Sequence, residues 1–145
     1  MKKKIAIAAS AVLAVVMLTG FRGGGWNRDP ERIKQMITWK MNDRLDDLDA
    51  TDAQKASVSA VKDRLFEDGK RLAEEHQVTR LEVLTQLESD APDAAKLHSL
   101  VDSRIDSFRA FAHKVTDAAL EVHRVLTPAQ RKELSTEYRE KMGIK

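Results

Sequence analysis

The sequence predicts an all-α protein in which four helices are built on a long antiparallel helical hairpin. Three observations predict this class. A third of the 145 residues are charged and only seven are aromatic, which suits helices with one buried apolar stripe and a charged outer side. Glycine and proline together number nine, so few residues interrupt a helix. Apolar residues also recur at spacings of three and four, which is the helical period.

The first 25 residues differ from the rest and predict an export signal. Lysines at positions 2–4 precede an uncharged run of fourteen residues, 5–18, and a glycine-rich stretch then extends to Gly25. This pattern is typical of a secretory signal peptide, whereas a membrane-spanning helix needs about 20 apolar residues. We expect cleavage between positions 18 and 25, a periplasmic location and no stable membrane insertion afterwards. Because the chain has no cysteine, it is not a lipoprotein.

Removal of the signal changes the charge of the protein. Four of the 25 basic residues and none of the 23 acidic residues precede Gly25, which leaves 21 bases, 23 acids and a net charge of −2. No strongly basic face of the kind that binds phosphates remains, so nucleic acid is not an expected partner. The lack of cysteine excludes disulfides, thiolate metal sites and thiol nucleophiles.

Residues 26–145 are expected to form a single helical domain. A proline falls in the first turn of three of the helices, where its missing N–H costs nothing. The helices are predicted at about 30–48, 52–88, 92–126 and 128–142. The two long helices, about 55 and 50 Å in length, have so short a linker that they fold back with their apolar stripes face to face. An elongated hairpin leaves apolar surface uncovered, so we expect a homodimer.

The apolar stripe of each helix defines its expected core. The last helix is expected to bury Leu134 and Tyr138. The other stripes are Ile33, Ile37, Met41, Leu45 and Leu48 in the first helix; Val58, Val61, Leu65, Leu72, Val83 and Leu87 in the second; and Leu97, Val101, Ile105, Phe108, Phe111, Ala112, Val115, Ala119, Val122 and Leu126 in the third.

Two helix starts share one capping pattern. Thr51 with Gln54, and Thr127 with Gln130, place threonine at the N-cap and glutamine at the third helical position. In this capping box each side chain bonds a backbone N–H that the helix leaves unpaired. Leu126 precedes the second box and can staple the helix entry. Starting a helix is a sufficient role for both motifs.

The two boxes also resemble the LTxxQ motifs of the Spy/CpxP family of periplasmic proteins. Residues 126–130 (LTPAQ) fit this motif in full, and residues 50–54 (ATDAQ) fit it except for alanine at the leading position. The resemblance implies a cradle-shaped homodimer that acts as an ATP-independent chaperone for unfolded envelope proteins in the envelope stress response. It also implies two alternatives: an adaptor that inhibits an envelope sensor kinase, and a heavy-metal-binding sensor or resistance protein like the ZraP-like and CnrX-like relatives.

Several side chains lie outside the predicted core and are candidates for client or dimer contacts. Apolar groups interleaved with cations suit the weak binding of unfolded chains, because hydrophobic contact holds them and charge attraction speeds the encounter. The same side chains suit a dimer interface equally well. These candidates are Trp39, Phe66, Lys70, Arg71, Val78, Leu81 and Leu84.

The metal alternative, for zinc, nickel or copper, depends on four histidines. The levels of the hairpin bring no two of them together within one chain. His76 lies on the apolar stripe and is expected in the core or an interface, whereas His113 and His123 are expected in solvent. These three are candidate ligands only for a site completed across a dimer or by other side chains.

No motif in the sequence predicts catalysis. There is no glycine-rich phosphate loop after a strand, no G-x-S-x-G elbow and no H-E-x-x-H helix. We therefore expect a binding protein without a cofactor rather than an enzyme.

Overall fold

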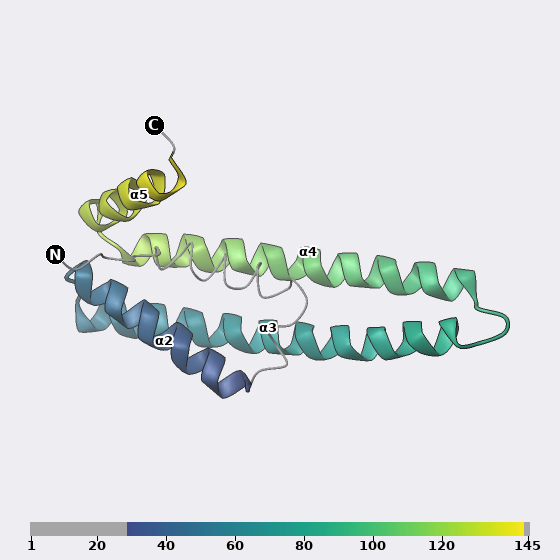
Figure 1. Cartoon of the computed structure of the whole chain (residues 1–145). Coiled ribbons are helices and arrows are strands. Elements are labelled where there is room, and N and C mark those ends of the chain that lie inside the picture. Colours follow the sequence, from purple (N-terminus) through teal and green to yellow (C-terminus); the bar gives the residue numbers. More distant parts are fainter. Residues whose placement is uncertain (1–28, 144–145) are drawn as a thin grey trace.

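Residues 29–143, which the computed structural model describes, form four α-helices and no strand. They are α2 (Pro30–Asp47), α3 (Asp52–Leu87), α4 (Ala94–Val125) and α5 (Pro128–Met142). The predicted all-α class and the hairpin of two long helices are confirmed (Figure 1). The expected signal segment and its cleavage point lie outside the described residues.

The hairpin consists of α3 and α4, which run side by side in opposite directions (Figure 1). At 36 and 32 residues, the arms are about 54 and 48 Å long. α4 begins at Ala94, so Pro92 lies in the linker and not in the first turn as predicted. The reason is that Asp93 is the N-cap, and its carboxylate accepts a hydrogen bond from the backbone N–H of Lys96 at 3.0 Å.

The two short helices join the hairpin at the same end, which we call the base (Figure 1). α2 packs obliquely along α3, whereas α5 turns away from the end of α4. Only Gln130 and Leu134 of α5 are buried, because the rest of this helix leaves the body. Tyr138, which was expected in the core, is therefore 39% exposed.

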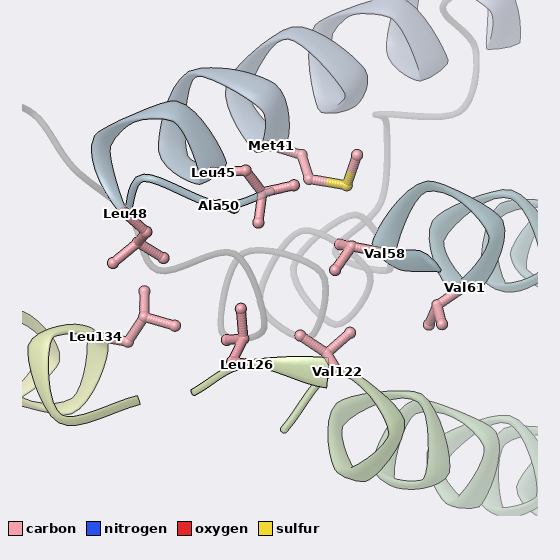
Figure 2. Close-up of a cluster of buried hydrophobic side chains, with 9 residues drawn as sticks. All are labelled: Met41, Leu45, Leu48, Ala50, Val58, Val61, Val122, Leu126 and Leu134. Atoms are coloured by element: carbon pink, nitrogen blue, oxygen red, sulfur yellow. The ribbon is translucent and has the colours of Figure 1, made fainter. Parts of the chain in front are cut away.

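Two clusters of buried apolar side chains form the core, and both lie toward the base. Figure 2 shows the first cluster, in which all four helices and the α2–α3 loop contribute side chains that point toward one another. The first cluster comprises Met41, Leu45, Leu48, Ala50, Val58, Val61, Val122, Leu126 and Leu134, and the second comprises Ile37, Leu65, Phe66, Leu72, Phe111 and Val115.

Between Ala73 and Ala110, a part that the structure describes in full, no residue is buried. We call this part the distal half. The prediction that the apolar stripes are buried along the whole hairpin is therefore wrong there: Leu87, Val101 and Ile105 are 63, 55 and 51% exposed. The physical reason is that two helices alone bury only their line of contact, and the third helix of the core, α2, lies alongside the base half only.

The two capping boxes lie side by side at the base and bind each other. Each glutamine Oε1 accepts a bond from the backbone N–H of its own threonine, both at 2.9 Å. The Nε2 of Gln54 donates to the carbonyl of Val125 and to Oε1 of Gln130, both at 2.9 Å. The Nε2 of Gln130 donates to the carbonyl of Leu48 at 3.1 Å and to Oε1 of Gln54 at 3.3 Å. The pair thus joins the ends of α2 and α4 to the starts of α3 and α5.

Two buried cations fix α2 in place. The guanidinium of Arg44 forms an ion pair with Glu137 of α5, while the ammonium of Lys62 on α3 donates to Oγ1 of Thr38 at 2.7 Å. Arg44 and Lys62 are each only 4% exposed. Arg44 also lies 3.5 Å from Asp47, and Lys62 lies 3.1 Å from Asp63. Because a buried charge needs such partners, the contacts with Glu137 and Thr38 help to hold α2 against both of its neighbours.

Replacement of Gln130 by glutamate tests the glutamine pair. Glutamate still suits the third position of a capping box, but it has no N–H to give to Leu48 or Gln54. We expect Gln130→Glu to lower the free energy of unfolding by about 2 kcal/mol, because buried carbonyls lose their donors. Urea unfolding at pH 7 measures this loss. The control Gln77→Glu, at an exposed site of α3, should change it by less than about 0.5 kcal/mol, and equal effects of the two changes would refute a special role for the pair.

Candidate functional site

The distal half exposes apolar side chains on the same side of the hairpin that α2 covers nearer the base. Leu84 follows Phe66 by 18 residues, which is five full helical turns, so both side chains project from the same side of α3. Phe66 is 2% exposed and packs in the cluster that contains Ile37 of α2, whereas Leu84 is 53% exposed. The apolar side of α3 therefore continues after its cover ends.

The matching side of α4 is also apolar. Phe108 precedes Leu126 by 18 residues, and Leu126 packs in the cluster with Met41 and Leu45 of α2. Val101 and Ile105 share the side of Phe108, because they precede it by seven and three residues. We call this combined region the distal surface; it consists of Leu81, Leu84 and Leu87 of α3 and Val101, Ile105 and Phe108 of α4.

Cationic side chains lie close to the distal surface. Partial burial lowers the pKa of His76, and the positive charges of Arg104 and Arg80 lower it further. Arg104 of α4 also lies 4.0 Å from the carboxylate of Glu75. Two guanidinium groups thus lie close to a histidine that prefers its neutral form, at the level where the core ends. Apolar side chains beside cations are the arrangement expected of a binding surface.

The side chains predicted from the sequence as a client or dimer surface divide into two groups. Trp39, Val78, Leu81 and Leu84 are exposed, at 66, 67, 57 and 53%. Phe66 is not: it is buried against α2, because α2 crosses the side of α3 on which it lies. The prediction that it belongs to an outer surface is wrong.

The two cations in that predicted set lie on different sides of α3. Arg71 forms an ion pair with Asp68, and Lys70 is partly buried. Arg71 follows Phe66 by five residues, which places it about 140° away around the helix. Lys70 follows Phe66 by four residues, or about 40°, so it lies on the side of α3 that the leucines share. Arg80 and Arg104 lie near His76.

The sequence interpretation placed Val101, Ile105 and Phe108 in the core and so missed them as surface residues. The length of the predicted first helix could have shown that part of the hairpin has no covering helix. A helix of about 19 residues covers about 28 Å, which is roughly half of the predicted hairpin, so part of the stripe had to lack a third layer.

All four histidines are exposed, including His76, for which a core or interface position was expected. His76 remains outside the core because no helix covers α3 at its level. Among the described residues, the structure places no three histidine, aspartate or glutamate side chains where they hold one metal ion. His76, His113 and His123 are solvent-accessible side chains. Nor does any helix within 29–143 combine the length and apolar character needed to cross a membrane.

The lowered pKa of His76 predicts a pH-dependent stability. Folded His76 binds a proton less readily than the unfolded chain does, so the free energy of unfolding falls as pH is lowered through about 6.5. We expect His76→Gln to make this fall shallower, and Arg104→Gln to do so partly by removing one repulsive charge. Urea unfolding between pH 7.5 and 5 measures the slopes. Parallel curves for His76→Gln and the unchanged protein would contradict the prediction.

Comparison with known proteins places this helical hairpin in a family. The model of the heavy-metal resistance family matches residues 5–133, which include α2, α3, α4 and the start of α5. This family belongs to the Spy/CpxP-like group, whose motifs the two capping boxes resemble. No curated protein and no solved structure matches the chain. Since the match covers most of its length, the chain belongs to the heavy-metal resistance family.

Proposed function

We propose that the protein is exported to the periplasm and acts there in the response to heavy metals, by binding rather than by catalysis. Membership of the heavy-metal resistance family is the observation that carries this proposal. The charged segment and apolar run at the start of the sequence support export. The proposed role is that of a sensor or resistance protein for zinc, nickel or copper.

The exposed histidines support direct metal binding. Neutral imidazole is a good ligand for zinc, copper and nickel, and the lowered pKa of His76 favours its neutral form. A metal site in a protein takes about three or four side-chain ligands. We therefore propose that the ion binds between two copies of the chain, with histidine supplied by both.

Metal titration tests this role. We expect zinc, nickel or copper to bind the purified protein with micromolar or tighter affinity and to promote association of two chains. At least one of His76→Ala, His113→Ala and His123→Ala should weaken binding about tenfold or more, which is the usual effect of losing a ligand or its support. Affinity should fall as pH is lowered, because protons compete for imidazole.

Isothermal calorimetry and sedimentation velocity measure affinity and association in the same samples. The control His98→Ala removes the fourth exposed histidine, which is outside the candidate set, and should leave affinity unchanged. Equal affinities in all four variants, or no binding at micromolar metal, would exclude histidine-based metal sensing.

A second candidate function, binding of unfolded envelope proteins, is favoured by the distal surface. Its six apolar side chains are 39 to 63% exposed, and Arg80 and Arg104 lie beside it. Such a surface gains free energy by covering apolar area while its charges speed the encounter with a client. It equally fits a second copy of the chain, and we expect a homodimer.

Suppression of aggregation tests the second candidate. We expect the protein, without nucleotide, to reduce light scattering by a thermally unfolding client enzyme, and Leu81→Asn with Leu84→Asn to remove most of this effect. The control Leu120→Asn changes a leucine of the base half that is 49% exposed, so it should retain the effect. If the three proteins behave alike, the distal surface does not bind clients.

The other two expected partners are a second copy of the chain and an envelope sensor kinase, and each has its own test. Dissociation of a dimer by the double leucine change alone would assign the distal surface to self-association. Specific cross-linking of the protein to one envelope sensor kinase would favour an adaptor role in place of client binding.

A further inference from the structure

A cleft of about 170 Å³ opens between α3 and α4, away from the distal surface. Arg71, on its rim, projects from α3 about 140° away from Phe66, and α2 covers the side of Phe66. The cleft thus opens on the other side of the hairpin. It lies at the level where the buried core ends, between the base half and the distal half.

The walls of the cleft have two chemical characters. Leu72 and Phe111, which are 4 and 3% exposed, supply apolar surface at its inner side. Ala110 and Ser107 of α4 also line it, and their short side chains leave the space open. An apolar group of modest size therefore finds contact on α3 and α4 at once.

The outer wall of the cleft is charged and carries an excess of positive charge at one end. Asp68 accepts a hydrogen bond from Nζ of Lys114 at 2.7 Å, and the same oxygen accepts one from Arg71. The single carboxylate of Asp68 thus neutralises only one of the two positive charges that it contacts. At the other end, the carboxylate of Glu75 also lines the cleft, and Arg104, which is outside the lining, lies 4.0 Å from it.

We propose that this cleft binds a small carboxylate that bears an aromatic or branched apolar group, either a free acid or the C-terminal residue of a peptide. The carboxylate binds Arg71 and Lys114 and neutralises the positive charge that Asp68 does not neutralise. Arg71 suits this role because guanidinium binds carboxylate through paired N–H groups. The apolar group lies against Leu72 and Phe111.

The two halves of this ligand have separate requirements. An inorganic anion pairs with the cations but makes no favourable contact with the apolar wall. A neutral apolar molecule contacts the apolar wall but does not pair with the cations. Desolvation of Arg71 and Lys114 is offset only when a carboxylate replaces the lost water. The inference is independent of both metal binding and client binding, because it uses neither the histidines nor the distal surface.

Titration with 3-phenylpropionate, followed by ¹H–¹⁵N NMR, tests the proposal. We expect saturable shifts of Leu72, Ala110 and Phe111 with a Kd on the order of 1 mM, as befits so small a ligand. The matched neutral probe, 3-phenylpropanamide, should bind about tenfold or more weakly, because it lacks the charge. Glycylphenylalanine and its C-terminal amide form a second matched pair, made of peptides. If glycylphenylalanine binds more tightly than 3-phenylpropionate does, the site is assigned to a peptide C-terminus.

Two variants and one control locate the site. Arg71→Gln should weaken 3-phenylpropionate binding about tenfold, and Ala110→Leu should abolish it by filling the cleft. Arg109→Gln is the control: Arg109 is 65% exposed and pairs with Asp106 three residues away, as Arg71, at 63%, pairs with Asp68. Circular dichroism verifies that each variant is folded.

Three outcomes would overturn the proposal. The first is equal affinity for the acid and its amide, and the second is equal affinity in the Arg71→Gln and Arg109→Gln variants. The third is the absence of saturable shifts at the cleft with millimolar 3-phenylpropionate.

Discussion

The amide pair of Gln54 and Gln130 is the contact on which the arrangement of the four helices depends. Each glutamine caps its own helix through Oε1 and donates both N–H groups of its Nε2 across the junction. A buried amide with all of these bonds made is stable, and one with some missing is costly. The pair therefore couples four helix ends at the base, where Leu126 and Leu134 close the core around it.

This constraint divides the molecule into two unlike halves. At the base, α2 adds a third layer, and the buried ion pair of Arg44 with Glu137 ties this layer to α5. Beyond Leu72 and Phe111 only the two hairpin arms remain, and no residue up to the turn is buried. Local stability follows buried apolar contact, so the distal half opens at a lower cost than the base does.

Much of this fold follows from sequence alone because its signals are local. Helical periodicity gives the four helices, and the Thr-x-x-Gln pattern gives the starts of α3 and α5, since capping boxes involve residues three positions apart. The bonds between Gln54 and Gln130 join residues 76 positions apart, and no local pattern reports such a contact. Periodicity also identifies an apolar side without showing what covers it. For this reason Phe66 was assigned to the surface and Val101 to the core, whereas the structure has them the other way round.

The site predictions were limited in the same way, because local sequence patterns do not show which residues of other helices lie nearby. The charges around His76 arise from Arg80 on its own helix and Arg104 on the opposite arm, and sequence spacing alone does not show the second of these. Both the distal surface and the cleft begin where α2 no longer contributes to the core. Binding residues placed there are free to vary without loss of the amide pair, whereas substitutions at the base change stability first. The fold thus places the amide pair at the base and the distal surface beyond it, so the residues available to a client lie apart from those that couple the four helix ends.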